Sequence, residues 1–242
     1  MHKKQFVLIS LLLIAALQFA FISQSNIVND KIVAMKVDPK LKHIKLYWKD
    51  DKGTILGSLQ NLISYTNSKH ERLLFAMNGG MYKEDQSPLG LFIQDKKMLS
   101  HLNTAAGKGN FYMNPNGVFY LTNDNSARIC KTQDFNNTND VVYATQSGPM
   151  LVIDGAINPL FTDDSQNLNI RNGVGILPDN TVVFAMSKQK INFYDFANYF
   201  KNLGCKNALY LDGFVSRTYF PDGDWKQTDG DFGVMIGVTD NQ

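Results

Sequence analysis

The sequence predicts an α+β protein with a mixed or antiparallel β-sheet core and few helices. Most apolar runs have the length of a strand, and Gly, Asn and Asp separate them. Some neighbouring runs flank sequences typical of hairpin turns, such as 114–117 and 178–180. Only one segment, 192–204, has a strong helical pattern.

The predicted strands follow the apolar runs in chain order. A short helix is expected at 59–68, and loops are expected at 100–109 and 123–140. The strands are expected at 32–37, 43–48, 73–77, 111–113, 118–121, 141–145, 150–153, 174–177, 181–186 and 207–211.

The segment 192–204 carries all three signals of an amphipathic helix. Asn192 can cap its first turn, and Gly204 suits the left-handed position after its last turn. Between them, one apolar stripe is formed by Phe193, Phe196, Ala197, Phe200 and Leu203. Such an aromatic stripe is typical of a core-facing helix, and the buried-looking strand 207–211 follows it directly.

Composition excludes several classes of protein. Of 242 residues, 44% are apolar and 19% are charged, which is unlike a disordered, collagenous or polytopic membrane protein. Because Lys3 and Lys4 lie in the first 25 residues, the rest of the chain carries 22 basic and 22 acidic side chains. A neutral body argues against binding of nucleic acid through its phosphates.

The N-terminus predicts an exported protein. Lys3 and Lys4 precede the apolar run 6–22, and the small residues Ser23 and Ser25 follow it. We therefore expect a signal peptide at 1–25, or an N-terminal anchor if it is not cleaved, and one domain at 26–242. The expected location is periplasmic or extracellular, with membrane contact only through an uncleaved leader.

Cysteine and histidine make no metal-binding or catalytic pattern. The four histidines are scattered, and Cys130 and Cys205 lack the spacing of a zinc site. In an oxidising compartment these two cysteines could form a disulfide. We expect no cofactor, because ATP and nicotinamide nucleotides are scarce outside the cell.

Polar clusters occur where apolar strands meet glycine. Glycine permits close approach of a ligand to the backbone, and neighbouring amide, hydroxyl and carboxyl groups can bond sugar hydroxyls. The same sequences are also ordinary turn formers, and an isolated arginine is often part of a structural ion pair. The clusters comprise Asn78-Gly79-Gly80, Gln146-Ser147, Arg171-Asn172 and Asp212-Gly213 with Ser216.

In chain order these clusters resemble the phosphodiester glycosidase family. The similar segments are AMNGGMY (76–82), NPNGVFYL (114–121), QSGPMLV (146–152), RNGVGI (171–176), NFYDFANYF (192–200) and ALYLDGFVS (208–216), followed by DFGVMIGV (231–238). The sequence departs from the glycine-rich Asp-Gly-Gly-Gly-Ser run of many relatives at 212–216, and Arg171 is followed by Asn172 rather than Thr.

The resemblance implies a site built from Asn78, Arg171, Asp212 and Ser216. Gly79, Gly80 and Gly213 would shape it, and Gln146 and Ser147 would contribute a polar turn that contacts the substrate. In the mechanism expected, Arg171 clamps a phosphate and Asp212 acts as base or nucleophile. No second carboxylate is clearly indicated, although Asp195 and Glu84 are candidates.

The expected function is hydrolysis of a glycosyl-1-phosphodiester by an exported glycosidase, with a carbohydrate or sugar-phosphate substrate. One alternative is a non-catalytic exported protein that binds carbohydrate or envelope polysaccharide through Tyr82, Tyr112 and Trp225. A second alternative is a hydrolase of a linkage without phosphate, in which Arg171 would contact a carboxylate.

Overall fold

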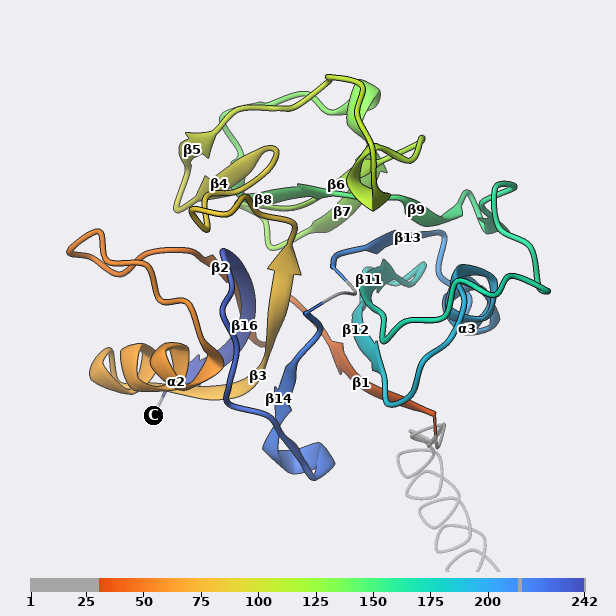
Figure 1. Ribbon diagram of the computed structural model, residues 1–242. Coiled ribbons are helices and arrows are strands. Elements are labelled where there is room, and N and C mark those ends of the chain that lie inside the picture. Colours follow the sequence, from red (N-terminus) through yellow and green to blue (C-terminus); the bar gives the residue numbers. More distant parts are fainter. Residues whose placement is uncertain (1–30, 213–214, 242) are drawn as a thin grey trace, which may run out of the picture. The chain divides into compact units, whose positions relative to one another are not determined.

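The computed structural model describes residues 31–212 and 215–241. Within them the chain forms three antiparallel β-sheets and two α-helices, joined by loops (Figure 1). The fold class expected from the sequence is thereby confirmed. The predicted leader and Gly213 lie outside the described residues. Neither described helix is long and apolar enough to span a membrane.

The first sheet has six strands in the order β1-β12-β11-β13-β9-β10. Helix α3 (Phe193–Asn202) lies beside it, next to β9 and β10 (Figure 1). The strands are β1 (Ile32–Val37), β12 (Val182–Ser187), β11 (Asn172–Ile176), β13 (Asn207–Tyr210), β9 (Met150–Ile153) and β10 (Ala156–Ile157).

The second sheet has five strands in the order β15-β14-β3-β16-β2, and α2 (Leu59–Ser68) contacts β3 (Figure 1). Its centre is the long pair of β3 and β16, which stay antiparallel through two register shifts. The strands are β15 (Trp225–Lys226), β14 (Thr218–Phe220), β3 (Glu71–Gly80), β16 (Val234–Asn241) and β2 (His43–Tyr47).

The third sheet has five strands in the order β5-β4-β8-β6-β7. Short 3-10 helices flank it and the other sheets, namely η1 (Asn110–Tyr112), η2 (Thr132–Asp134) and η3 (Pro221–Gly223). The strands are β5 (Lys97–Ser100), β4 (Phe92–Gln94), β8 (Val141–Ser147), β6 (Gly117–Thr122) and β7 (Ala127–Lys131).

One buried apolar cluster joins the three sheets. Phe184 of β12 stacks on Phe75 of β3 at 5.6 Å between ring centroids, and it meets Phe119 of β6 edge-on at 6.0 Å. All three side chains are fully buried. Burial of each such ring stabilises the fold by roughly 1.5–3 kcal/mol. The three sheets are therefore held against one another by apolar packing.

Helix α3 forms as its local sequence predicts. The Asn192 side chain accepts a hydrogen bond from the backbone N–H of Asp195 at 2.7 Å. Phe193, Phe196, Ala197 and Phe200 are buried on one face. Gly204 follows with a φ of +86°, a conformation that glycine adopts without the usual steric cost.

Two local predictions were wrong. The expected loop 123–140 contains β7, in which Ala127 and Ile129 point into the core and Arg128 points outward. This alternation is short and lies among Asn and Asp residues, so pairing with β6 decides the structure. The expected strand 111–113 instead lies in and just after η1, so 114–117 is not a hairpin turn.

Both cysteines carry free thiols in the described structure. Burial raises the pKa of the Cys130 thiol to about 11 and that of the Cys205 thiol to about 12. Neither thiol is therefore activated as a nucleophile.

Candidate functional site

Two asparagine side chains join the end of β3 to the beginning of β11. Asn172 Nδ2 donates to the backbone oxygen of Asn78 at 2.9 Å and to its Oδ1 at 3.0 Å. Both residues are fully buried, and they lie 94 positions apart in the sequence. The contact therefore fixes the second sheet against the first at the place where the predicted polar residues converge.

The same two amides hold the backbone of Asp212. Asn172 Oδ1 accepts from the Asp212 N–H at 2.8 Å, and Asn78 Nδ2 donates to the Asp212 carbonyl at 3.0 Å. Ser216 Oγ also donates to that carbonyl at 2.8 Å. Asp212 is half-buried, and its backbone is anchored through both its N–H and its carbonyl.

Residues of β8 bring the third sheet to this cluster. Ser147 Oγ donates to the carbonyl of Leu211 at 2.5 Å, and Thr145 Oγ1 donates to the carbonyl of Gly79 at 3.2 Å. Both hydroxyl-bearing residues are buried. All three sheets thus contribute to one polar cluster, which we define as Asn78, Ser147, Asn172, Asp212 and Ser216.

The glycines of β3 are required for packing between sheets. A Cβ on Gly79 would lie 2.6 Å from Ile236 Cγ1 of β16, and a Cβ on Gly80 would lie 2.6 Å from Thr145 Oγ1 of β8. Both distances are far below van der Waals contact. The pair of glycines therefore lets β3 approach its neighbours closely enough for Asn78 to reach its partners.

Gln146 lies outside the polar cluster. Its Oε1 accepts from the N–H groups of Leu91 and Asn103, and its Nε2 donates to Asn103 O and Thr132 Oγ1. Since successive residues of a strand point to opposite faces, Gln146 faces away from the side to which Thr145 and Ser147 point. In the structure it organises the segment that follows β3.

Arg171 also lies outside the polar cluster, on the other face of the first sheet from Asn172. Its guanidinium carbon is 3.5 Å from the centroid of the Phe193 ring, and the residue is fully buried. Nε donates to Ile191 O at 2.9 Å, and Nη2 donates to Asn167 O at 2.7 Å. Nη1 has no hydrogen-bond partner in the described part of the chain.

Burial lowers the pKa of the Arg171 guanidinium, and the nearby Tyr210 opposes that shift. The side chain packs against Phe193 of α3, on the face of the first sheet that α3 covers. Its predicted contact with a phosphate remains a prediction.

The carboxylate of Asp212 acts electrostatically on Tyr82. Burial and then the charges of Asp212 and Asp231 raise the pKa of Tyr82 to about 12. The phenol donates to the backbone oxygen of Asp231 at 2.6 Å. Tyr82 is thus a neutral hydrogen-bonding group beside the carboxylate at neutral pH.

Arg217 borders the polar cluster and was missed by the sequence analysis. Its N–H donates to Asn78 Oδ1 at 3.0 Å, and its Nε donates to the Asp229 carboxylate at 2.9 and 3.1 Å. The signal that could have identified it is its position directly after Ser216. The alternative carboxylates lie elsewhere, Asp195 in the first turn of α3 and Glu84 on an exposed loop.

The family model described as phosphodiester glycosidase matches residues 71–239 of this chain. The chain belongs to the phosphodiester glycosidase family. Every site residue expected from the sequence lies within the matched range. YigE of Escherichia coli K12, which is described as uncharacterized, is 39% identical over 208 residues, covering 86% of this chain and 81% of YigE.

Solved structures share the fold of this family member at low sequence identity. The catalytic domain of zebrafish N-acetylglucosamine-1-phosphodiester alpha-N-acetylglucosaminidase, auto-inhibited by its pro-peptide, has a TM-score of 0.55 at 15% identity, covering 89% of this chain and 84% of that one. A hypothetical protein from Synechocystis has a TM-score of 0.53 at 13% identity, covering 88% and 60%.

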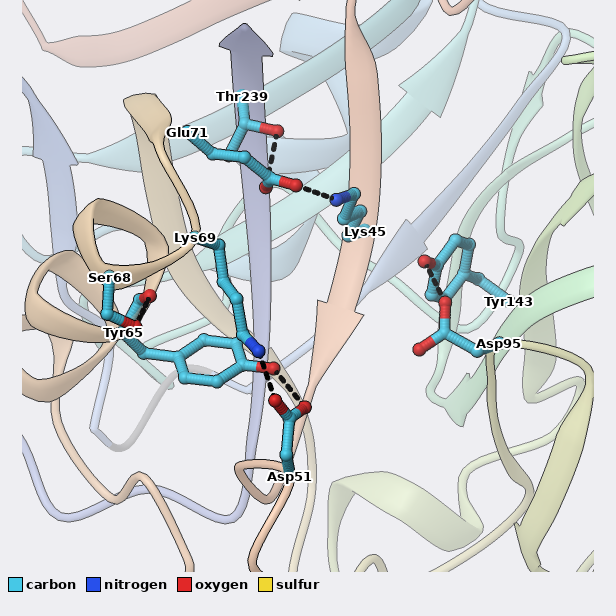
Figure 2. Close-up of polar contacts among 9 residues, drawn as sticks. All are labelled: Lys45, Asp51, Tyr65, Ser68, Lys69, Glu71, Asp95, Tyr143 and Thr239. Atoms are coloured by element: carbon cyan, nitrogen blue, oxygen red, sulfur yellow. Dashed lines mark hydrogen bonds and ion pairs between the residues drawn. The ribbon is translucent and has the colours of Figure 1, made fainter. Parts of the chain in front are cut away.

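A second group of polar contacts lies at the opposite end of β3. Figure 2 shows Glu71 between Lys45 and Thr239, and Tyr143 directed at Asp95. Along the strand, Glu71 lies seven residues before Asn78, which is about 23 Å at about 3.3 Å per residue. These contacts stabilise the far edge and are separate from the polar cluster.

A surface pocket of about 250 Å³ lies at this far end, lined in part by Lys42, Lys45 and Lys96. Lys42 pairs with Asp240 and Lys45 pairs with Glu71, so much of its positive charge is neutralised. Among the described residues, no group of three His, Cys, Asp or Glu side chains is arranged to hold a metal ion.

Proposed function

We propose that this chain is an exported hydrolase that cleaves the bond between C1 of a sugar and the oxygen of a phosphodiester. The observation that carries the proposal is the anchored, half-buried Asp212 at the junction of three sheets, in a member of the phosphodiester glycosidase family. Anchoring by Asn78 and Asn172 supports this role, because a reacting carboxylate must be held in place before the substrate arrives.

The reaction has a simple balance of atoms and electrons. A water oxygen bonds to C1 while the bond from C1 to the phosphate oxygen breaks, and that oxygen keeps the bonding electron pair. The proton lost by water is accepted by the Asp212 carboxylate. In the two-step version, Asp212 bonds to C1 first and water then displaces it. Phosphate leaves as a stable anion, so little protonation of the leaving group is needed.

The test uses the purified full chain and a panel of glycosyl phosphodiesters, with release of reducing sugar and phosphomonoester as the readouts. We expect Asp212→Asn to lower kcat by about 10²–10⁴-fold, the usual contribution of a positioned base. The matched control is Asp154→Asn, since Asp154 is exposed in a turn with a φ of +49°, which asparagine also adopts. Equal activity in both variants would remove Asp212 from the mechanism.

A second function is favoured by one observation, that the Asn78, Asn172 and Ser147 side chains bond to other atoms of the protein. In a non-catalytic carbohydrate-binding protein, this network would serve only to hold the fold. Glycan binding retained in Asp212→Asn, together with no turnover by the wild type, would favour that function.

Export is the part of the proposal that rests on the N-terminal sequence. Fractionation of cells that express the full chain, followed by N-terminal sequencing of the product, tests export and cleavage near Ser25. A chain found only in the cytosol, with its first residues intact, would contradict this part.

A further inference from the structure

Arg217 combines solvent access with direct attachment to the polar cluster. Its backbone N–H donates to Asn78 Oδ1 at 3.0 Å, the same amide group whose Nδ2 bonds to Asp212. The preceding Ser216 also bonds to the Asp212 carbonyl. The start of the Arg217 side chain is therefore fixed relative to the backbone of Asp212.

The Arg217 guanidinium is held on one side and available on the other. Nε donates to both oxygens of Asp229 at 2.9 and 3.1 Å, and Nη1 donates to Ser216 O at 3.0 Å. These bonds to other described residues involve only Nε and Nη1, so Nη2 is the nitrogen that we assign to the ligand. The side chain is 39% exposed, so a ligand in solvent has access to the residue.

Arg217 and Tyr82 are connected through the loop 229–231. Asp229 accepts the bonds from Arg217, and the backbone oxygen of Asp231 accepts the bond from Tyr82. Tyr82 in turn lies close enough to Asp212 for the carboxylate charge to raise its pKa. Arg217 and Tyr82 therefore border the same loop, and the Asn78 amide that holds the Arg217 N–H also holds the Asp212 carbonyl.

We infer that Arg217 binds the phosphoryl group of the substrate, an inference that rests on the proposed function. The carboxylates of Asp229 and Asp231 on the neighbouring loop would otherwise repel an arriving anion. A guanidinium presents several donors in a plane, so it can keep Asp229 on Nε while Nη2 bonds a phosphate oxygen. The Arg171 side chain, by comparison, is fully buried and bonded to carbonyls behind the first sheet.

The first test compares wild type with Arg217→Gln on two substrates of the same sugar, a glycosyl phosphodiester and a neutral aryl glycoside. We expect kcat/KM for the phosphodiester to fall about tenfold to a hundredfold, which corresponds to the loss of a charge-assisted hydrogen bond. We expect kcat/KM for the neutral glycoside to change less than about twofold, because that substrate has no anionic group to bind. Arg217→Lys keeps the charge without the planar donors, so partial recovery is expected.

The second test measures binding of inorganic phosphate and of glucose 1-phosphate by calorimetry. We expect Arg217→Gln to weaken both about tenfold or more, the effect of removing one charged donor. This measurement needs no turnover, so it tests phosphate binding by Arg217 separately from hydrolysis of a phosphodiester. A wild type that binds phosphate at Arg217 but hydrolyses no phosphodiester would contradict the proposed function alone.

The matched control is Arg72→Gln at the far end of β3. Arg72 also donates to a carboxylate through Nε and a terminal nitrogen, reaching Asp240 at 3.1 and 2.8 Å. Its replacement changes the net charge by the same amount and leaves the polar cluster unchanged. If Arg217→Gln and Arg217→Lys fold normally and bind phosphate as well as Arg72→Gln does, the inference is overturned.

Discussion

Replacement of Asn78 by alanine tests whether the polar cluster holds the sheets together. The Asn78 side chain makes three hydrogen bonds, to the Asp212 carbonyl, the Asn172 amide and the Arg217 N–H. Since a buried hydrogen bond contributes about 1 kcal/mol net, their loss should lower the free energy of unfolding by about 3 kcal/mol. For a domain of this size, that loss corresponds to a decrease of about 6–12 °C in Tm.

Asn207→Ala provides the matched comparison for Asn78→Ala. Asn207 lies at the other end of β13 from the polar cluster, and its side chain makes two hydrogen bonds, from Asp154 N and to Ile129 O. Its replacement should cost about 2 kcal/mol and leave the backbone of Asp212 in place.

Thermal and urea unfolding of both variants, followed by circular dichroism, gives the two free energies, and turnover measured well below Tm reports on the site. We expect Asn78→Ala to be the less stable variant and the only one of the two with reduced kcat. Equal or smaller destabilisation by Asn78→Ala would refute the argument that this amide joins the first and second sheets.

Two further predictions concern β3 and the loop after it. Gly79→Ala should lower the free energy of unfolding by about 1–3 kcal/mol through overpacking, since its Cβ would lie 2.6 Å from Ile236 Cγ1 and 3.0 Å from the Ile236 nitrogen; a urea midpoint equal to that of wild type would contradict this. Folding raises the pKa of Tyr82 from 10.0 to about 12, so the folded state favours the neutral phenol. This contribution to the free energy of unfolding is complete below pH 10 and is lost as the pH rises to 12. Tyr82→Phe should therefore lose less stability than wild type over this interval in unfolding curves at a series of pH values, and equal losses would show that another group is responsible.

Local signals in the sequence were sufficient for both helices and for most strands. Ser58 and Asn192 cap α2 and α3 through contacts within three residues. The 3-10 helix at Asn110–Tyr112 and strand β7 were not predicted. Strand β7 forms by antiparallel pairing with the preceding strand β6, which the short apolar alternation of β7 did not indicate. Burial of Ala127 and Ile129 against β6 outweighs the polar residues around them.

The sequence by itself determined the fold class and indicated that polar residues beside glycine form a site. Only the tertiary structure decided which side chains meet there. Gly173 pairs with Tyr210 in the register of β11 and β13, and this register directs Asn172 toward Asn78 and Arg171 toward α3. Because side chains alternate along a strand, a shift of one residue would exchange these directions. That register is set by packing between segments far apart in the chain, so the sequence could not show that the side chains of Arg171 and Asn172 point to opposite faces of the sheet.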